Sequence, residues 1–258
     1  MVGNSSKIAL VGTGNIAYHL YKEFTKKGIS VQTIVQRNIN NSENWIDALT
    51  LKVEYVSEIP SDSDLVIVCV NDDQIEQVLN ELNKDLPVAY TSGSVSLNQL
   101  PKRPKLGVFY PLQTFTKHKS VDFEKIPLLI EANDTDFQKE LMLLAQRLSN
   151  VVQLASSQER FYTHVAAVFV NNFSNHMYHI AAEFLANKNM SFSLLHPLLL
   201  ETTSKVLSMD PAKVQTGPAK RKDVKVIHKH LEELVGLDKE VYEVVSKSIM
   251  NKMKENEL

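Results

Sequence analysis

The stretch KIALVGTGNIAYHLYKEFTKKG, residues 7–28, decides the fold of this chain. It opens with an apolar run that ends at a glycine turn, and apolar residues then recur at the helical spacing of three and four positions. Gly28 follows the last of them, as glycine does at many helix ends. The stretch therefore predicts a buried strand, a tight turn and a helix in immediate succession.

The turn, GTGNIA, has the spacing of a dinucleotide-binding motif in which Ala17 takes the third small position. Gly12 permits the tight turn, and Gly14 lets the backbone come close to a diphosphate. The N–H groups that open the helix, at Asn15 and Ile16, supply donors and a partial positive charge. Because the motif stands between a strand and a helix, we predict a Rossmann-type cofactor site rather than a structural turn.

The end of the second predicted strand, residues 30–36, indicates which dinucleotide binds. Arg37 stands there, and no carboxylate follows until Glu43. An NAD site carries Asp or Glu at this position for the ribose hydroxyls, whereas an arginine suits the 2′-phosphate of NADP. We therefore predict NADP, with Arg37 on its 2′-phosphate. The alternative is an exposed arginine that merely closes the strand.

Three further segments of the first half supply candidate site residues. Val70 and Asn71 end a wholly apolar strand, so they should lie along the cofactor at the carboxyl edge of a parallel sheet. Ser92, in TSGS, leaves room for a nicotinamide ring, although turn chemistry would select the same residues. The strand that begins GVFY leads to Tyr110, a candidate substrate contact.

The remaining pattern predicts an α/β fold in which a mostly parallel sheet of about eight strands ends near Ala155. We expect a short helix at residues 44–51 and a short strand at residues 53–56. From residue 157 onward only helical patterns occur. The predicted domains are a Rossmann domain at residues 1–156 and an all-α domain for substrate and dimer contacts at residues 157–258.

A long helix is predicted for residues 159–186, with amides and imidazoles among apolar residues. On 3.6 residues per turn, one stripe within about 80° contains Phe161, Val165, Val168, Asn172, His176, His179 and Glu183. A neighbouring stripe contains His164, Asn171, Asn175 and Tyr178. We expect this helix to be buried, so that its polar groups meet one another or a ligand. A metal site is not expected, since the spacing gives no recognisable ligand set.

The segment PAKVQTGPAKRKD predicts a helix with Pro218 at its first position. Thr216 and the N–H groups of Ala219 and Lys220 would then form an anion site, reinforced by Arg221. Such a site suits a substrate carboxylate or phosphate. Solvated basic residues explain the same pattern equally well.

Composition excludes several classes of protein. With 28 basic and 30 acidic residues the chain lacks the charge of a nucleic-acid surface. No run approaches the roughly 18 apolar residues of a membrane span. The N-terminal segment lacks the pattern of a secretory signal, so we expect a cytoplasmic protein. Cys69 lies in an apolar run and is expected to act as a small buried hydrophobe.

Five motifs together resemble one bacterial family. They are VGTGNIAYHL, TSGS, GVFYPLQTF, HVAAVFVNNFSNHMYHIA and QTGPAKRKD. The family comprises NADP oxidoreductases with a Rossmann-like domain and a C-terminal helical domain of unknown function. It is similar to pyrroline-5-carboxylate reductase, ketopantoate reductase and the β-hydroxyacid dehydrogenases, whose helical domains resemble that of 6-phosphogluconate dehydrogenase. The resemblance implies the fold, the NADP(H) class of cofactor and a tendency to form homodimers through the helices, but no substrate.

One departure from these relatives bears on mechanism. The β-hydroxyacid dehydrogenases carry KxxNN in this helix, with the lysine as acid or base, and this chain has VFVNN. Asn172 matches the second asparagine, but Val168 replaces the lysine and cannot move a proton. His164, one turn earlier, is the best replacement because imidazole titrates near neutral pH. Pyrroline-5-carboxylate reductase lacks this lysine too, so imine reduction remains open.

The sequence thus predicts an NADP(H)-dependent oxidoreductase acting on a small anionic carbonyl, hydroxy or imino compound in a cleft between the domains. His164 would exchange a proton and Asn172 would orient the reacting atom. Asn175, Thr216 and Arg221 would bind the substrate. The alternative prediction, suggested by the missing lysine, is a non-catalytic protein that senses NADP(H).

Overall fold

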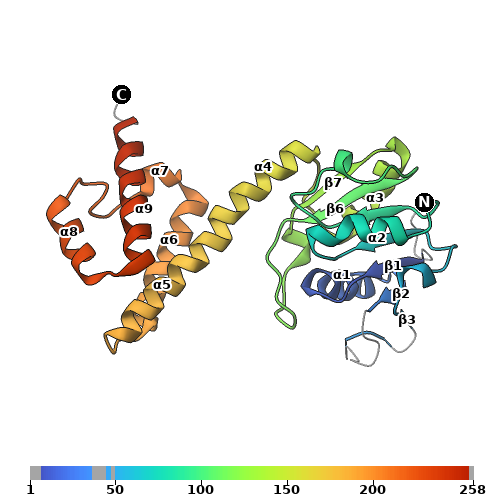
Figure 1. Ribbon diagram of the computed structural model, residues 1–258, viewed down its shortest axis with the longest axis horizontal. Coiled ribbons are helices and arrows are strands. Elements are labelled where there is room, and N and C mark those ends of the chain that lie inside the picture. The colour runs from blue at the N-terminus through green and yellow to red at the C-terminus, as the bar shows by residue number, and fades with distance from the viewer. Residues whose placement is uncertain (1–6, 37–44, 48–49, 256–258) are drawn as a thin grey trace. The chain divides into compact units, whose positions relative to one another are not determined.

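The computed structural model describes residues 7–36, 45–47 and 50–255. Within these residues one eight-stranded sheet has the order β3-β2-β1-β4-β5-β6-β7-β8 (Figure 1). The strands are β1 (Ile8–Val11), β2 (Val31–Val35), β3 (Leu51–Val53), β4 (Leu65–Val68), β5 (Val88–Tyr90), β6 (Leu106–Pro111), β7 (Leu128–Ala132) and β8 (Val152–Leu154). All neighbours are parallel except β6 and β7. The predicted Rossmann-type, mostly parallel sheet is confirmed.

Helices cover both faces of the sheet. Side chains of α1 (Asn15–Lys26) and α3 (Thr135–Leu148) share one apolar core with the sheet, and those of α2 (Ile75–Glu81) share the other. Successive residues of β1 alternate between the two cores, as the pleat of a strand requires. Every residue of β4 is fully buried. This burial on both faces explains why the central strands are continuous apolar runs.

The prediction for residues 44–56 was wrong in detail. The described residues 45–47 and 50 are not helical, β3 lies two residues before the predicted strand, and Val56–Glu58 is a 3₁₀ turn. Trp45 is nevertheless buried, and its ring lies 5.4 Å from that of Tyr18 and 5.3 Å from that of Tyr21. Trp45 therefore packs on α1 from a stretch whose described residues are not helical, and residues 44, 48 and 49 of the predicted helix lie outside the described ranges.

The long helix after the sheet is interrupted. It comprises α4 (Ser157–Ala167), a π-helical segment (Val168–Phe173) and α5 (Ser174–Asn187). A π-turn bonds i to i+5 and so holds one more residue than an α-turn. The constant helical angle assumed for the predicted stripe does not hold across this segment. The expected burial was also wrong, because Asn172, Asn175, His176 and His179 are exposed in this chain.

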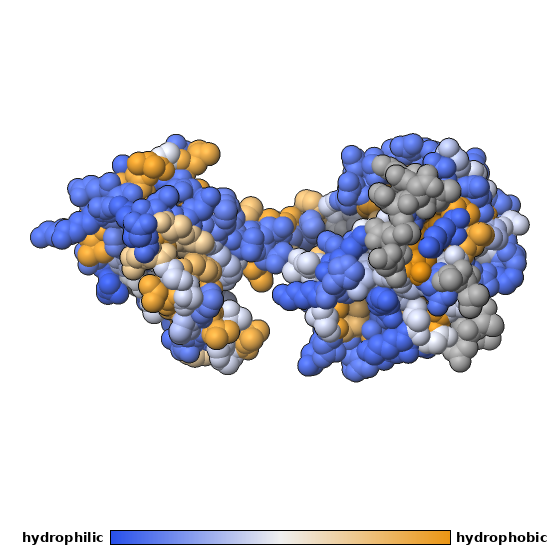
Figure 2. Space-filling model, turned by 90° about the horizontal axis from the view of Figure 1, so that it is seen from below, coloured by the Kyte–Doolittle hydropathy of each residue, from blue (hydrophilic) through white to orange (hydrophobic). Residues whose placement is uncertain are grey.

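Contacts divide the chain into two compact units, Met1–Asn171 and Asn172–Leu258. The change from strands to helices falls at Ser157, as expected, and the contact division places α4 in the first unit together with the sheet. The second unit contains α5, α6 (His196–Ser208), α7 (Pro211–Val214), α8 (Val224–Glu233) and α9 (Gly236–Glu255). Figure 2 shows apolar residues scattered over the surface of this helical unit.

The predicted helix start at Pro218 was wrong. Residues 218–222 form turns, and α8 begins at Val224. Asp223 is the reason, because its Oδ1 accepts the N–H of Val226 (3.2 Å) and caps the helix. Lys222, at φ 57°, separates the turns from the helix. Within the described ranges, no helix combines the length and apolar character needed to cross a bilayer.

Candidate cofactor and catalytic site

The turn between β1 and α1 requires glycine at its first position. Gly12 has φ 105°, a conformation that side-chain-bearing residues rarely adopt. A Cβ on Gly12 would also lie 2.6 Å from the carbonyl oxygen of Cys69 at the end of β4. The close approach of these two loops therefore depends on Gly12. Burial raises the pKa of the Cys69 thiol to about 12, so this thiol remains neutral and serves packing.

Gly14 is different, because apart from its chain neighbours no atom of the described residues lies within 4 Å of a Cβ built on it, and its φ is −69°. It occupies the N-cap position of α1 without a capping side chain, and the first turn of α1 has no acidic residue. The Asn15 side chain accepts the N–H of Lys117 (3.2 Å). The helix start thus presents backbone N–H groups, at Asn15 and Ile16, beside open space, which suits an anion.

A cavity of about 610 Å³ lies at the carboxyl ends of β1, β2 and β4. This volume is within the range of about 300–1,000 Å³ usual for small-molecule sites. Four predicted cofactor residues line it together: Gly12, Gly14, Val70 and Asn71. On the β3 side, Glu54 and Tyr55 complete its wall. Arg37, predicted to bind the 2′-phosphate, lies outside the described residues.

The turn that follows β5 uses Ser92 structurally. Ser92 is buried, and its Oγ accepts the N–H groups of Ser94 (3.1 Å) and Val95 (3.0 Å). Its side chain is therefore already engaged in closing the turn. Ser94 donates its hydroxyl to the carboxylate of Asp72, which follows β4. The two loops are tied together at the carboxyl edge of the sheet.

Tyr110 and His164 form a hydrogen-bonded pair next to this turn. Tyr110, at the end of β6, is buried, and its Oη lies 3.1 Å from Nδ1 of His164 on α4. His164 is half-buried. Gly93 makes the contact possible, because a Cβ there would lie 2.6 Å from His164 Nδ1 and 2.8 Å from Tyr110 Cζ. Burial raises the pKa of Tyr110, so the phenol stays protonated and able to donate.

The sequence did not single out Arg160, a fully buried arginine on the same helix as His164. Arg160 donates from Nη1 to the carbonyl oxygen of Ser92 (2.8 Å) and from Nη2 to Glu131 Oε2 (3.1 Å). Ser157 donates its N–H to the same carboxylate (2.9 Å). The only sequence signal for Arg160 is its position four residues before His164, which puts both on one face of α4.

The other predicted site residues belong to the helical unit. Asn172 lies in the π-helical segment and Asn175 in α5, and both are exposed. Thr216 and Arg221 are exposed on either side of the buried Ala219. Thr216 borders a cavity of about 240 Å³. The anion site expected there loses its helix start, because Asp223 caps α8.

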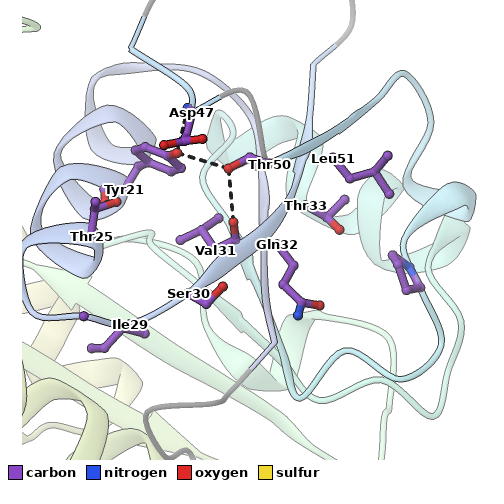
Figure 3. Close-up of a pocket in the computed structure, with 12 residues that line it drawn as sticks. Tyr21, Thr25, Ile29, Ser30, Val31, Gln32, Thr33, Asp47, Thr50 and Leu51 are labelled. Carbon is purple, nitrogen blue, oxygen red and sulfur yellow. Dashed lines mark hydrogen bonds between the residues drawn. The ribbon is translucent and has the colours of Figure 1, made fainter.

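A second cavity of the sheet unit, of about 560 Å³, lies at the opposite end of β2 (Figure 3). Residues that precede and open β2 line it, whereas Gly12 donates its N–H to Val35 at the other end of that strand (3.1 Å). The Tyr21 hydroxyl accepts the N–H of Asp47 (2.8 Å) and lies 3.1 Å from Thr50 Oγ1. These polar groups bond to one another, and the cavity is separate from the cofactor site.

Histidines of α5 do not assemble a metal site among the residues that the structure describes. His179 Nε2 lies 3.5 Å from Glu183 Oε1, and its ring centre lies 6.3 Å from that of His176. No group of three potential metal ligands occurs within the described ranges. Two ligands at most fall short of the three or four that a protein zinc site uses.

Two family models match the chain. Residues 7–89 match the family described as NADP oxidoreductase, coenzyme F420-dependent. Residues 126–249 match the domain of unknown function DUF2520. No curated protein sequence matches the chain significantly.

Solved structures resemble the chain over nearly its whole length. A Bacteroides fragilis protein provisionally named an NADP oxidoreductase is 35% identical, with 96% of this chain and 99% of that one covered and a TM-score of 0.88. An imine reductase from Myxococcus stipitatus, in complex with NADP+, is 13% identical, with 96% and 93% covered and a TM-score of 0.67. A 1-pyrroline-5-carboxylate reductase from Streptococcus pyogenes is 17% identical, with 98% and 100% covered and a TM-score of 0.61. The last two show a shared fold only.

Proposed function

The chain belongs to the NADP oxidoreductase family that joins a Rossmann-like domain to the DUF2520 helical domain, and we propose that it transfers hydride between NADP(H) and a small anionic carbonyl, hydroxy or imino compound. The observation that carries this proposal is the cavity lined by Gly12, Gly14, Val70 and Asn71. Backbone donors open α1 next to it, as a diphosphate requires. NADP would supply or accept the hydride.

The Tyr110–His164 pair supports a role in proton transfer. His164 donates as the imidazolium, in which both ring nitrogens carry a proton: Nδ1–H donates to the Tyr110 oxygen, and Nε2–H can pass its proton to a reacting oxygen or nitrogen. The neutral imidazole that remains keeps its proton on Nδ1, next to Tyr110, and the Tyr110 phenol stays protonated. His164 is thus the proposed proton donor in the direction of reduction, and Tyr110 fixes its tautomer.

We assign the remaining substrate contacts to the helical unit. Asn172 would orient the reacting atom through its amide. Asn175, Thr216 and Arg221 would bind the anionic end of the substrate, and their exposed polar groups suit that task. The family likeness supports the reaction class, and the basic residues in the QTGPAKRKD segment are the reason for proposing an anionic substrate.

Two measurements test the proposal. NADPH binding is followed by its fluorescence, and hydride transfer by the loss of NADPH absorbance with a panel of keto, hydroxy and imino acids. We expect tight binding and turnover with at least one member. Tight binding without turnover of any compound would favour the NADP(H) sensor, which the valine at position 168 suggests. Absence of binding would contradict both functions.

Cofactor choice is expected to depend on Arg37. Replacing Arg37 by aspartate should weaken NADPH binding by roughly 10- to 100-fold, because a charge-assisted hydrogen bond contributes about 1.5–3 kcal/mol. NADH lacks the 2′-phosphate, so its dissociation constant should change little. Fluorescence titrations of both cofactors against both proteins measure the effect. Equal weakening of the two would remove Arg37 from the site.

We also propose that the protein forms a homodimer through its helical unit. Among the described residues of that unit, Ala219 and Ile227 are the only apolar side chains that are buried. A domain of this size normally has an apolar core of its own. Its α6 instead exposes Leu200 and Leu207 by 74% and 82%, and their spacing of seven places them on one face. A second copy of this chain would cover such a face.

Introducing negative charges on this face of α6 is expected to dissociate the dimer. We predict that the wild-type protein has the mass of two chains in solution, and that Leu200→Asp combined with Leu207→Asp yields single chains. Light scattering coupled to gel filtration measures the masses. Leu143→Asp on α3 is the matched control, since Leu143 is also exposed but belongs to the sheet unit. A wild-type protein with the mass of one chain would refute the proposed dimer.

A further inference from the structure

Arg160 is the one arginine of the described residues whose side chain is completely buried. Its guanidinium joins the turn after β5, through the Ser92 carbonyl, to β7, through Glu131. It also donates to Ser157 Oγ (3.3 Å) at the start of α4. Burying a charge is costly unless it is paired, and Glu131 provides the pair. One cation therefore holds three chain segments together.

The arrangement leaves part of the guanidinium unsatisfied. Arg160 Nε is buried and has no hydrogen-bond partner in the part of the chain that the structure describes. Among the described residues, Arg103 Nε is likewise buried without a partner, so the orphaned donor does not by itself set Arg160 apart. What distinguishes Arg160 is where its Nη1 and Nη2 bond, since both hold segments next to the Tyr110–His164 pair.

These segments adjoin the Tyr110–His164 pair: α4 carries His164, and β7 pairs with β6, which carries Tyr110. His164 follows Arg160 by four residues, one turn along the same face of α4. Gly93, against which both rings pack, directly follows the Ser92 carbonyl that Arg160 holds. By holding that carbonyl and the start of α4, Arg160 therefore fixes the turn that contains Gly93 and the helix that carries His164.

Arg160 also acts on the Tyr110–His164 pair through its charge. Burial raises the pKa of the Tyr110 phenol, while the nearby charge of Arg160 lowers it and that of Asp72 raises it. Arg160 also pairs with Glu131 (3.1 Å). The charges of Arg160 and Asp72 thus act on the Tyr110 phenol in opposite directions.

We propose that Arg160 is a positioning residue, which holds His164 within hydrogen-bond reach of Tyr110 by clamping the Ser92 carbonyl and Glu131 with its two terminal nitrogens. The inference rests on the proposed function, in which His164 exchanges the proton. It assigns no contact between Arg160 and substrate or cofactor. It requires the planar fork of arginine, which lysine does not reproduce.

The test compares Arg160→Lys with a buried arginine elsewhere. Arg103 is also buried and donates to the carbonyls of Leu79 (2.9 Å) and Leu82 (3.3 Å), but it precedes the amino end of β6, whereas Tyr110 lies near the carboxyl end. Arg103→Lys therefore disturbs a comparable site without touching the pair. Both variants are first checked for folding by circular dichroism and thermal unfolding.

We expect Arg160→Lys to fold and to bind NADPH as the wild type does, with kcat lowered about 10- to 100-fold, as misplacement of a catalytic group predicts. Arg103→Lys should keep the wild-type kcat. The imidazole NMR signals of His164, identified by their loss in His164→Ala, should move in Arg160→Lys and stay in Arg103→Lys. Unchanged kcat and unchanged His164 signals in Arg160→Lys would overturn the inference.

The NMR comparison separates this inference from the proposed function. If the wild-type protein turns over no compound, the proposed enzyme fails, yet the His164 signals still report whether Arg160 positions that ring. If the wild type is active and Arg160→Lys is equally active, only the role of Arg160 fails. Should Arg160→Lys not fold, Glu131→Gln replaces it, because this variant keeps the arginine and removes the anchoring charge. The same shift of the His164 signals is then expected, and its absence overturns the inference.

Discussion

Gly14→Ala is expected to leave the fold intact and to weaken NADPH binding about 10- to 100-fold. Beyond the two chain neighbours, the part of the chain that the structure describes places no atom within 4 Å of the added methyl group. The φ of −69° also suits alanine, so the free energy of unfolding should not fall. The methyl group instead occupies the space through which a diphosphate reaches the start of α1. Loss of one charge-assisted hydrogen bond, about 1.5–3 kcal/mol, accounts for the magnitude.

Alanine substitutions at two other glycines, Gly12 and Gly28, distinguish an effect on NADPH binding from an effect on folding stability. Gly12→Ala should lower both NADPH affinity and the free energy of unfolding, the latter by at least about 1–3 kcal/mol, because it combines backbone strain with the Cys69 contact. Gly28→Ala, at φ 69° in open space, should lower the free energy of unfolding by about 1–2 kcal/mol without changing affinity. Denaturant unfolding and fluorescence titration measure the three variants. Wild-type affinity in Gly14→Ala would place the cofactor elsewhere.

His164→Ala is expected to lower hydride transfer about 100- to 10,000-fold, the usual contribution of a positioned acid or base. NADPH binding should be retained, since His164 contacts Tyr110 and Gly93 and not the glycine turn. Loss of NADPH absorbance with the best compound of the substrate panel measures the rate. A rate within about threefold of the wild type would exclude His164 as the proton donor.

Tyr110→Phe tests whether the two rings act together. It keeps the buried ring and removes the hydroxyl that bonds His164 Nδ1. If the pair is one unit, the double variant with His164→Ala should be no slower than His164→Ala alone, because effects of coupled residues do not add. Rate losses that multiply in the double variant would show that Tyr110 acts independently of His164.

Local signals were sufficient to predict much of the sheet unit. The strand, glycine turn and helix of residues 7–28 appear as β1, Gly12 and α1. The apolar run before Asn71 became the fully buried β4. The carboxyl-edge rule also brought Val70 and Asn71 to the same cavity as Gly12 and Gly14. These features depend on backbone conformation and on the alternation of apolar residues, and short segments of sequence determine both.

The prediction of which residues share one face of the long helix was wrong for a physical reason. A π-turn and an α-turn accept the same kinds of residue, so the period of the sequence does not announce the extra residue in Val168–Phe173. The burial of α5 could not be predicted either. Its apolar residues indicate that they pack against another protein surface. Their pattern does not say whether that surface belongs to the same chain or to a second one.

The sequence by itself determined most of the strands and helices of the sheet unit, the glycine turn and the family to which the chain belongs. Only the tertiary structure decided that Tyr110 meets His164 across 54 positions of sequence, that Gly93 packs against both rings and that Arg160 is fully buried. Hydrophobic periodicity determines which side of an element faces the core. Which polar atoms then come within hydrogen-bond distance depends on how distant segments pack, and no local pattern encodes that.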